Sequence, residues 1–340
     1  MNSPSLLSLA NPFLSYPPST NFSHDHASLL DFIPGFLPSR LAFELDLSTN
    51  HDFVDTLICL PTNKLGYLSS VLQASSGSSP LHPNLLAFPS IVSAAASLDE
   101  LVYLFDHVWF EIDHQPKNFL NLFLGSESSY LSRDDCLLLA DSALKFFAPF
   151  LNGAISGLAH SFLYNSLSPF FDTGFVIVEL GAMCRDNASH LKCLFSLNYP
   201  LSFDKFLSLP LVANHLGFHA IEQIHNSGLL DSVMAFDHQC KLSVAFYSSY
   251  FLLAVEITPI TRSFDLGQII SIWDGLIDPF TLLGVDASRV SGRSARLMQF
   301  PNVNVQSRIN HFKLSFLDGR PKVKIYFDCC FSDSVHAPAK

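Results

Sequence analysis

The chain has 340 residues, of which 49% are apolar and only 14% charged, and this composition excludes disorder over most of its length. Its 19 basic and 30 acidic residues give a formal net charge of −11, which argues against a protein that binds nucleic acids or anionic membranes. The 32 phenylalanines indicate a Phe-rich core, because a surface with that many phenylalanines would aggregate.

The cysteines and the N-terminus bear on the cellular compartment. Seven cysteines occur without a C-x-x-C pair or regular spacing, which predicts reduced thiols and neither a disulfide framework nor a zinc site. The sequence shows no secretory signal, and the apolar stretch at 150–171 carries His160 and several other polar residues. We therefore expect a cytoplasmic protein without a membrane span, and the histidine spacings predict no metal-binding residues.

Three regions follow one another along the chain. Residues 1–38 are rich in Ser, Pro and Asn, and they are predicted to form a loosely ordered arm. Residues 39–331 carry recurring strands and helices and are predicted to form a single domain. Residues 332–340 are a short polar tail.

Alternating apolar and polar residues predict the strands. In chain order these segments are 41–47, 108–113, 175–185, 190–197, 233–237, 241–247, 252–257, 312–317 and 322–328. Asp318-Gly319-Arg320-Pro321 stands between the last two segments and predicts a hairpin turn. Helical spacing predicts helices over 92–105, 134–147, 202–209, 213–225 and 265–276.

One face of nearly every predicted strand mixes charged, small and aromatic residues, whereas the opposite face is Leu, Val, Ile and Phe. Residues two apart in a strand share a face. The polar face comprises Ala42, Glu44, Asp46, Trp109, Glu111, Asp113, Glu179, Gly181, Met183, Arg185, Lys192, Ser196, Ala235, Asp237, Lys241, Ser243, Ala245, Tyr247, Ala254, Glu256, Lys313, Ser315, Lys322, Lys324, Tyr326 and Asp328. Most acids lie in the early strands and the bases lie from Arg185 onward. This partition predicts a chamber in which one wall binds an anion and the other wall binds a second ligand, the acceptor of a reaction.

This pattern fits two architectures of the α+β class. An open antiparallel sheet with helices on one face would leave the polar face in water. A closed antiparallel β-barrel of about ten strands, surrounded by helices in αββα repeats, would enclose the polar face as a lumen. Small residues beside the charges and aromatic side chains on the same face favour the barrel, because they leave room for a ligand.

Three short segments resemble a known family. Lys322-Val323-Lys324-Ile325-Tyr326-Phe327 looks like the K-x-Y strand in the indole branch of the aromatic prenyltransferases of the ABBA type. Arg185-Asp186-Asn187-Ala188-Ser189-His190-Leu191-Lys192 is similar to the basic strand pair of the cyanobactin peptide branch. Phe43-Glu44-Leu45-Asp46 lies where the family's first strand often carries an acid. The family's tyrosine shield is incomplete, because Leu194 and Ser243 follow Lys192 and Lys241 at the spacing where a tyrosine is expected.

The resemblance implies transfer of a prenyl group from an allylic diphosphate, such as dimethylallyl diphosphate, to an aromatic or peptide acceptor in natural product biosynthesis. The expected roles are diphosphate binding by Arg185, Lys192, Lys241, Lys313 and Lys324, cation shielding by Trp109, Tyr247 and Tyr326, and proton acceptance by Glu44 or Glu111. The only cofactor that the resemblance implies is Mg²⁺ bound together with the diphosphate. The alternatives are a non-catalytic ligand-binding barrel and an accessory protein of a biosynthetic assembly.

Overall fold

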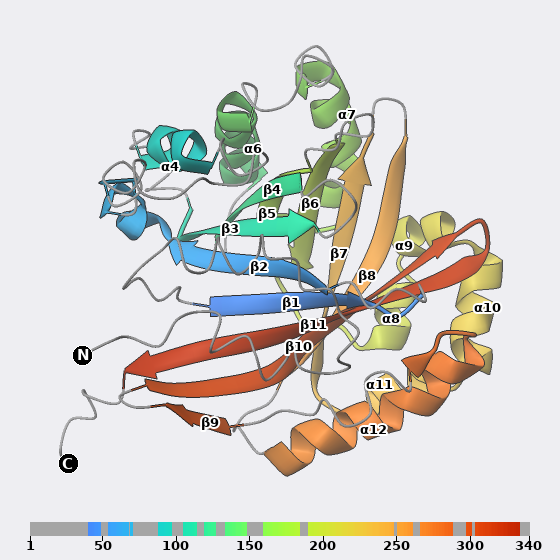
Figure 1. Ribbon diagram of the computed structural model, residues 1–340. Coiled ribbons are helices and arrows are strands. Elements are labelled where there is room, and N and C mark those ends of the chain that lie inside the picture. Colours follow the sequence, from blue (N-terminus) through green and yellow to red (C-terminus); the bar gives the residue numbers. More distant parts are fainter. Residues whose placement is uncertain are drawn as a thin grey trace.

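The alternating segments pair in chain order into an antiparallel β-barrel of ten strands with helices outside it (Figure 1). The computed structural model describes residues 40–48, 54–67, 69–70, 88–96, 105–113, 119–126, 133–147, 159–183, 190–247, 250–260, 266–287, 297–300 and 303–333. The strands are β1 (Arg40–Asp46), β2 (Val54–Pro61), β3 (His107–Asp113), β4 (Phe119–Gly125), β5 (Phe175–Met183), β6 (His190–Leu197), β7 (His238–Phe246), β8 (Phe251–Pro259), β9 (Leu297–Phe300), β10 (Val303–Leu317) and β11 (Arg320–Asp333).

Pairing between the first and last described strands closes the barrel. β1 to β8 pair in sequence, β8 pairs with β10, and β11 pairs with both β10 and β1, while β9 pairs only with β10. The β1–β11 register runs from Arg40 opposite Cys330 to Asp46 opposite Lys324. Closure removes the exposed edges that an open sheet would present. The barrel prediction is therefore confirmed, and the open-sheet alternative is wrong.

The β10–β11 hairpin has the predicted turn. Asp318 and Gly319 both have positive φ, at 52° and 74°, as a two-residue type I′ turn requires. Glycine adopts this conformation without steric cost, and Asp is among the residues that tolerate it best. The turn thus fixes the register of the two longest strands in the barrel.

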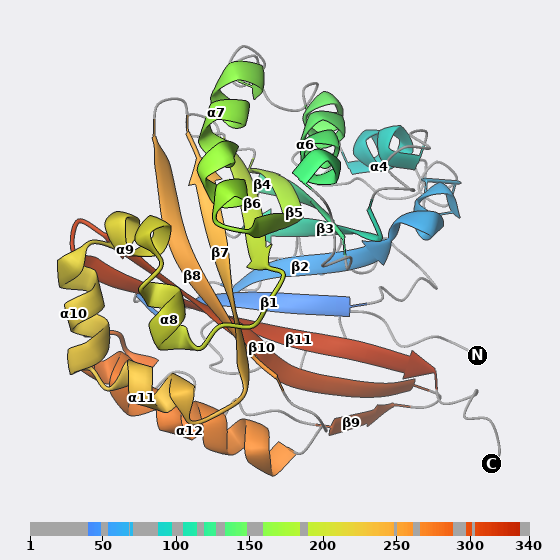
Figure 2. The ribbon, with the colours of Figure 1, turned by 180° about the vertical axis from the view of Figure 1, so that it is seen from behind.

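The helices cover the outer face of the barrel in two groups (Figures 1 and 2). One group comprises α4 (Phe88–Ala96), α6 (Arg133–Phe147) and α7 (Ala159–Asp172). The other comprises α8 (Phe203–Leu207), α9 (Pro210–Leu216), α10 (Phe218–Asn226), α11 (Leu229–Met234) and α12 (Leu266–Leu282). None of the described helices is both long enough and apolar enough to cross a membrane.

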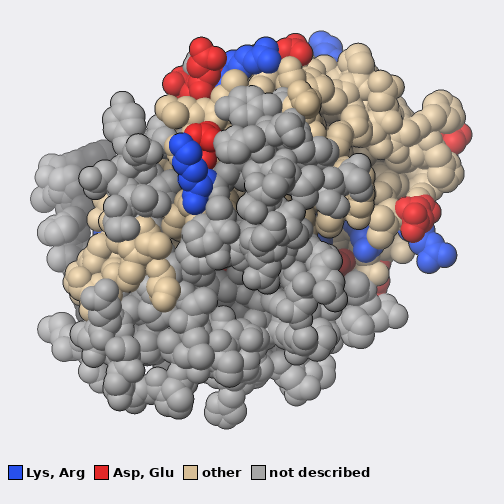
Figure 3. All heavy atoms as spheres, turned by 90° about the horizontal axis from the view of Figure 1, so that it is seen from above, with Lys and Arg blue, Asp and Glu red and all other residues tan. Residues whose placement is uncertain are grey.

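Phenylalanine fills the layer between the barrel and the helices, as the composition predicts. The largest fully buried side chains among the described residues are all phenylalanines. Phe170 of α7 stacks on Phe195 of β6 with ring centroids 4.5 Å apart, and it also contacts Phe175 and Phe246. On the outside of the molecule, seen from above, the described residues show only scattered charged side chains (Figure 3).

The structure corrects several predicted elements. The segment 233–237 is not a strand, because α11 runs to Met234 and β7 begins only at His238. The predicted helix over 213–225 is two helices, which meet at Gly217 with φ 80°. The helix predicted over 92–105 is α4, which begins four residues earlier, and Phe105 already leads into β3. β2, β4, β9, α7 and α11 were not predicted, and Arg185 and the N-terminal arm lie outside the described residues.

Replacing Phe170 with Ala should lower the free energy of unfolding by about 3–5 kcal/mol, because it removes a fully buried ring from a stack of aromatic side chains. Urea unfolding measures this change. The matched control is Phe218→Ala, since Phe218 is 82% exposed and its loss should change stability by no more than about 0.5 kcal/mol. Equal effects of the two substitutions would contradict the packing described here.

Gly181 of β5 faces the lumen and lies directly against the Phe123 ring of β4. A Cβ at position 181 would come within 1.9 Å of Phe123 Cδ1, so Gly181→Ala must displace the ring. We expect this overpacking to cost about 1–3 kcal/mol in urea unfolding. Gly275→Ala in α12 is the control, since nothing lies within 4 Å of a Cβ there, and it should not destabilise the protein. An unchanged stability of the Gly181 variant would show that the ring moves without cost.

Candidate functional site

Barrel closure turns the polar strand face inward and buries its charges. Glu44 and Glu111 are each 2% exposed and Asp328 is fully buried. A buried charge is strongly unfavourable unless a partner or a ligand compensates it. Charges that have no partner inside the protein are therefore candidates for contact with a ligand.

A cavity of about 430 Å³ lies at one end of the lumen. Its wall includes the first residues of β1 and β3, Arg40 and His107, and residues near the start of β7 and the end of β8, such as Lys241 and Thr258. Four predicted site residues line it: Trp109, Lys192, Lys241 and Tyr326. These residues come from β3, β6, β7 and β11, so only the folded barrel brings them together.

Lys192 and Lys241 carry positive charge into the cavity. Among the described residues neither ammonium group has an ion-pair or hydrogen-bond partner, and Lys192 Nζ lies 4.8 Å from the centre of the Phe123 ring. Burial by itself lowers the pKa of Lys192. The carboxylates of Glu111 and Glu44 outweigh burial and raise this pKa above its usual value, so Lys192 stays protonated at neutral pH.

Aromatic side chains form much of the remaining cavity wall. The Tyr326 ring stacks on His311 with centroids 4.1 Å apart, while its hydroxyl donates a hydrogen bond to Glu44. Burial lowers the pKa of His311 to about 4, so this imidazole is neutral at pH 7. Trp109 and Phe123 pack together within an apolar cluster of the lumen. The cavity therefore presents both cationic groups and π faces to a ligand.

Two ion pairs cross the seam between β1 and β11. Arg40 Nη2 lies 2.5 Å from Asp328 Oδ2, and the Arg40 guanidinium carbon lies 5.4 Å from the centre of the Trp109 ring. Lys324 donates to Glu44 at a position four residues further along each strand. Burial alone would raise the pKa of Glu44, but Lys324 and Lys192 lower it to about 2. A carboxylate held in this way is a weak base.

A third set of paired charges joins β8 to β10. Lys313 Nζ lies 3.5 Å from Glu256 Oε1 and donates to Ser243 Oγ at 2.5 Å, while His311 Nε2 lies 3.7 Å from Glu256 Oε2. Burial and the nearby Lys192 lower the pKa of Lys313 to about 7. Glu256 lines the cavity, whereas Lys313 is not among the residues that line it.

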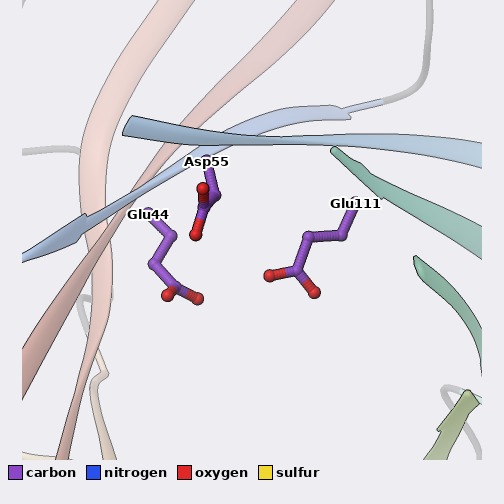
Figure 4. A group of neighbouring side chains, drawn as sticks. All are labelled: Glu44, Asp55 and Glu111. Carbon is purple, nitrogen blue, oxygen red and sulfur yellow. The ribbon is translucent and has the colours of Figure 1, made fainter. Parts of the chain in front are cut away.

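Carboxylates from the first three strands meet in the lumen. Glu44, Asp55 and Glu111 point toward one another, and each offers an oxygen within 4.8 Å of the others (Figure 4). None of the three lines the cavity. Glu44 and Glu111 each lie four residues along their strands from Arg40 and His107, a distance of about 13 Å. Both acids nevertheless adjoin residues that do line the cavity, since Tyr326 lies opposite Glu44 and Leu57 lies opposite Glu111.

The remaining predicted site residues fall elsewhere. Tyr247 stacks on His190 at 4.5 Å and on Tyr250 at 4.7 Å, away from the cavity lining. Arg185 lies outside the described residues. Lys313 and Lys324 do face the lumen, but each contacts a carboxylate there.

Sequence reasoning missed part of the cavity wall. Phe123 lies on β4, where apolar residues face both sides, so the segment shows no alternation. Arg40 immediately precedes the predicted first strand. Glu179 was placed on the polar face without a role, yet it lines the cavity beside Val178, the extra residue of a β-bulge in β5. Bulges are frequent next to active sites, because they redirect side chains, and that bulge is not readable from the sequence.

Glu44→Gln should lower the free energy of unfolding by about 3 kcal/mol at neutral pH, because Lys324 is left without its buried carboxylate. The folded-state pKa of about 2 lies below the ordinary 4.5, so the stabilisation is complete above pH 4.5 and disappears as the pH falls toward 2. Urea unfolding between pH 3 and 7 tests this. Asp141→Asn is the control, since its ion pair with Lys145 is on the surface and contributes about 0.5 kcal/mol at most. A difference between wild type and Glu44→Gln that does not change with pH would contradict the assignment.

Known proteins resemble this chain in structure and not in sequence. No protein family and no curated protein matches the chain at the sequence level. Among solved structures, AnaPT from Neosartorya fischeri superposes with a TM-score of 0.51 at 10% identity, covering 95% of this chain and 90% of that one. AnaPT is an aromatic prenyltransferase with the ABBA barrel. At this identity the likeness shows the fold alone, and this chain has the ABBA-type barrel fold of the aromatic prenyltransferases.

Proposed function

We propose that the protein transfers a prenyl group from an allylic diphosphate to an aromatic or peptide acceptor inside the barrel. The observation that carries the proposal is the cavity, in which the Lys192 and Lys241 ammonium groups have no anionic partner among the described residues. Two partly buried ammonium groups that face one cavity without an ion-pair partner among the described residues favour an anionic ligand. The fold shared with AnaPT makes an allylic diphosphate the favoured ligand.

The chemistry follows from the arrangement of charge and aromatic rings. Ionisation of the allylic C–O bond leaves its electron pair on the diphosphate, and ammonium groups positioned beforehand stabilise that charge. The allyl cation formed at the same time is stabilised by the π faces of Trp109, Phe123 and Tyr326. The barrel wall keeps water from the cation, which would otherwise give an alcohol in place of the prenylated acceptor.

The proposal places some predicted residues in supporting roles. Lys313 and Lys324 each contact a carboxylate that offsets their charge, so the proposal assigns contact with the diphosphate to Lys192 and Lys241. Arg185 keeps its predicted role as a diphosphate ligand. Glu111 stays a predicted proton acceptor, whereas the ion pair with Lys324 argues against that role for Glu44.

The proposal keeps Mg²⁺ only as an ion that prenyl transfer does not require. The carboxylates of Glu44, Asp55 and Glu111 are of the donor type that Mg²⁺ prefers. They lie outside the cavity lining, however, and Lys324 already contacts Glu44. These residues fit a metal held apart from the diphosphate better than one that bridges it, so we expect prenyl transfer to tolerate a chelator.

Incubation with dimethylallyl diphosphate and a panel of indole, phenol and peptide acceptors, with Mg²⁺ or with EDTA, tests the function. The expected result is an acceptor heavier by one prenyl group in both conditions. Diphosphate binding without any product would favour the second candidate, a ligand-binding barrel without chemistry, which the same cavity also suits. Absence of both binding and product would contradict the proposal.

Lys192→Met and Lys241→Met should each weaken the binding of inorganic diphosphate at least tenfold, because each removes one unpaired cation from the cavity. Isothermal titration calorimetry at constant ionic strength measures the affinity. Lys205→Met, on the exposed side of α8, removes the same charge away from the cavity and serves as the control. The same affinity in all four proteins would show that the anion binds elsewhere.

A further inference from the structure

Glu179 is an acid on the wall of a cavity that otherwise suits an anion. It lines the cavity together with Lys192 and Lys241. Among the described residues its carboxyl group has no ion-pair or hydrogen-bond partner, whereas Glu256, which lines the same cavity, lies 3.5 Å from Lys313. An ionised Glu179 would repel the anion that the two ammonium groups attract. The carboxylate form of Glu179 is therefore unfavourable for binding an anion in this cavity.

A β-bulge in β5 fixes Glu179 at this position. The bulge at Val178 places Glu179 opposite Leu194 of β6, and both Val178 and Glu179 line the cavity. In an unbroken strand, two successive residues would face opposite sides of the sheet. Lys192 lies opposite Gly181, two residues further along β5. The bulge thus brings a carboxyl group to the cavity wall near an ammonium group without placing the two directly opposite each other.

The charged groups on the β6 side of Glu179 act on it in both directions. Burial raises the pKa of Glu179 to about 7, and Glu256 of β8 adds to this effect. Lys192 of β6, Lys241 of β7 and Lys313 of β10 oppose it. The carboxyl group is therefore divided between its acid and carboxylate forms at neutral pH.

The β4 side of Glu179 holds an imidazole and an exposed acid. Glu179 pairs with Gly125, and the His107 ring lies so close to this glycine that a Cβ there would overlap His107 Nε2. His107 also lines the cavity. Asp106 is exposed and accepts a hydrogen bond from Ser126 Oγ at 3.5 Å. The ammonium groups that act on Glu179 thus all lie on its β6 side.

We propose that Glu179 binds the anion as the neutral acid, donating a hydrogen bond to it beside the Lys192 and Lys241 ammonium groups, so that the cavity takes up a proton together with the anion. The inference rests on the proposed function for the identity of the anion, a diphosphate group. A protonated carboxyl group supplies an O–H donor that the carboxylate lacks. The proton comes from water and returns to water when the anion leaves, and no other bond forms or breaks.

Anion binding and protonation of Glu179 then favour each other. Below pH 7 the carboxyl group is already protonated, so its titration leaves the affinity unchanged. Above pH 7 the anion must raise the pKa of Glu179 to bind, and each further pH unit costs up to about a factor of ten in affinity. Glu179 thus makes the affinity fall as the pH rises above neutrality.

Glu179→Gln tests this coupling, because the amide donates a hydrogen bond without taking a proton from water. Isothermal titration calorimetry with inorganic diphosphate at constant ionic strength measures the affinity at pH 6 and pH 8.5. The variant should bind within about threefold of wild type at pH 6 and at least about tenfold more tightly at pH 8.5. Ionisation of the diphosphate itself affects both proteins equally, so the ratio of their affinities isolates Glu179.

Infrared difference spectroscopy detects the proton directly. Addition of diphosphate to wild type at pH 8 should produce the carbonyl band of a protonated carboxyl group, which Glu179→Gln should lack. Lys313, whose pKa is also about 7, has no such band and is thereby distinguished. Absence of the band in wild type would overturn the inference even where the Gln variant does not fold.

Two further variants complete the design. Glu179→Asp should keep the pH dependence of wild type, because it keeps a carboxyl group. Glu222→Gln, on the exposed face of α10, is the matched control and should behave as wild type at both pH values. Equal affinities of wild type and Glu179→Gln at pH 8.5, or weaker binding by the variant at that pH, would overturn the inference and leave the proposed function intact. A wild-type protein that binds no diphosphate at either pH would overturn both.

Discussion

Pairing of β1 with β11 is the interaction on which the rest of the structure depends. It joins segments nearly 300 residues apart, since Arg40 lies opposite Cys330, and it turns a sheet with one polar face into a barrel with a polar interior. Enclosed charges must then be compensated. The ion pairs lie at pairings between strands that do not follow one another in the chain. Arg40–Asp328 and Glu44–Lys324 link β1 to β11, and Glu256–Lys313 links β8 to β10.

This placement divides the lumen charges by their use. One group of charges links strands at the β1–β11 and β8–β10 pairings. β1 and β11 are distant in sequence, and β8 and β10 pair over only four residues. Glu179, Lys192 and Lys241 come instead from β5, β6 and β7, which pair in sequence order. All three strands contribute residues to the cavity wall, so the charges without an ion-pair partner among the described residues adjoin the space for a ligand.

The lumen-facing residues distinguish the strands that the sequence predicted from the strands that it failed to predict. β1 and β11 alternate because polar residues such as Glu44 and Tyr326 face inward, and this alternation was readable. β2 and β4 direct Leu57, Cys59 and Phe123 into the lumen, where these residues contribute to an apolar cluster, so the alternation of apolar and polar residues is interrupted in both strands. The error arose because the interior of this barrel is only partly polar.

For the strands that it predicted, the sequence by itself determined which residues face the lumen outside the bulges, because the period of two assigns each strand residue to one side regardless of its partners. It also placed acids early and bases late, but closure brings the acidic β1 beside the basic β11, so the two kinds of charge meet in ion pairs at the seam. Only the tertiary structure decided which charges are paired and which are available. Strand register and bulges set the distances between side chains, and these distances leave Glu44 bound to Lys324 but Glu179 facing the cavity.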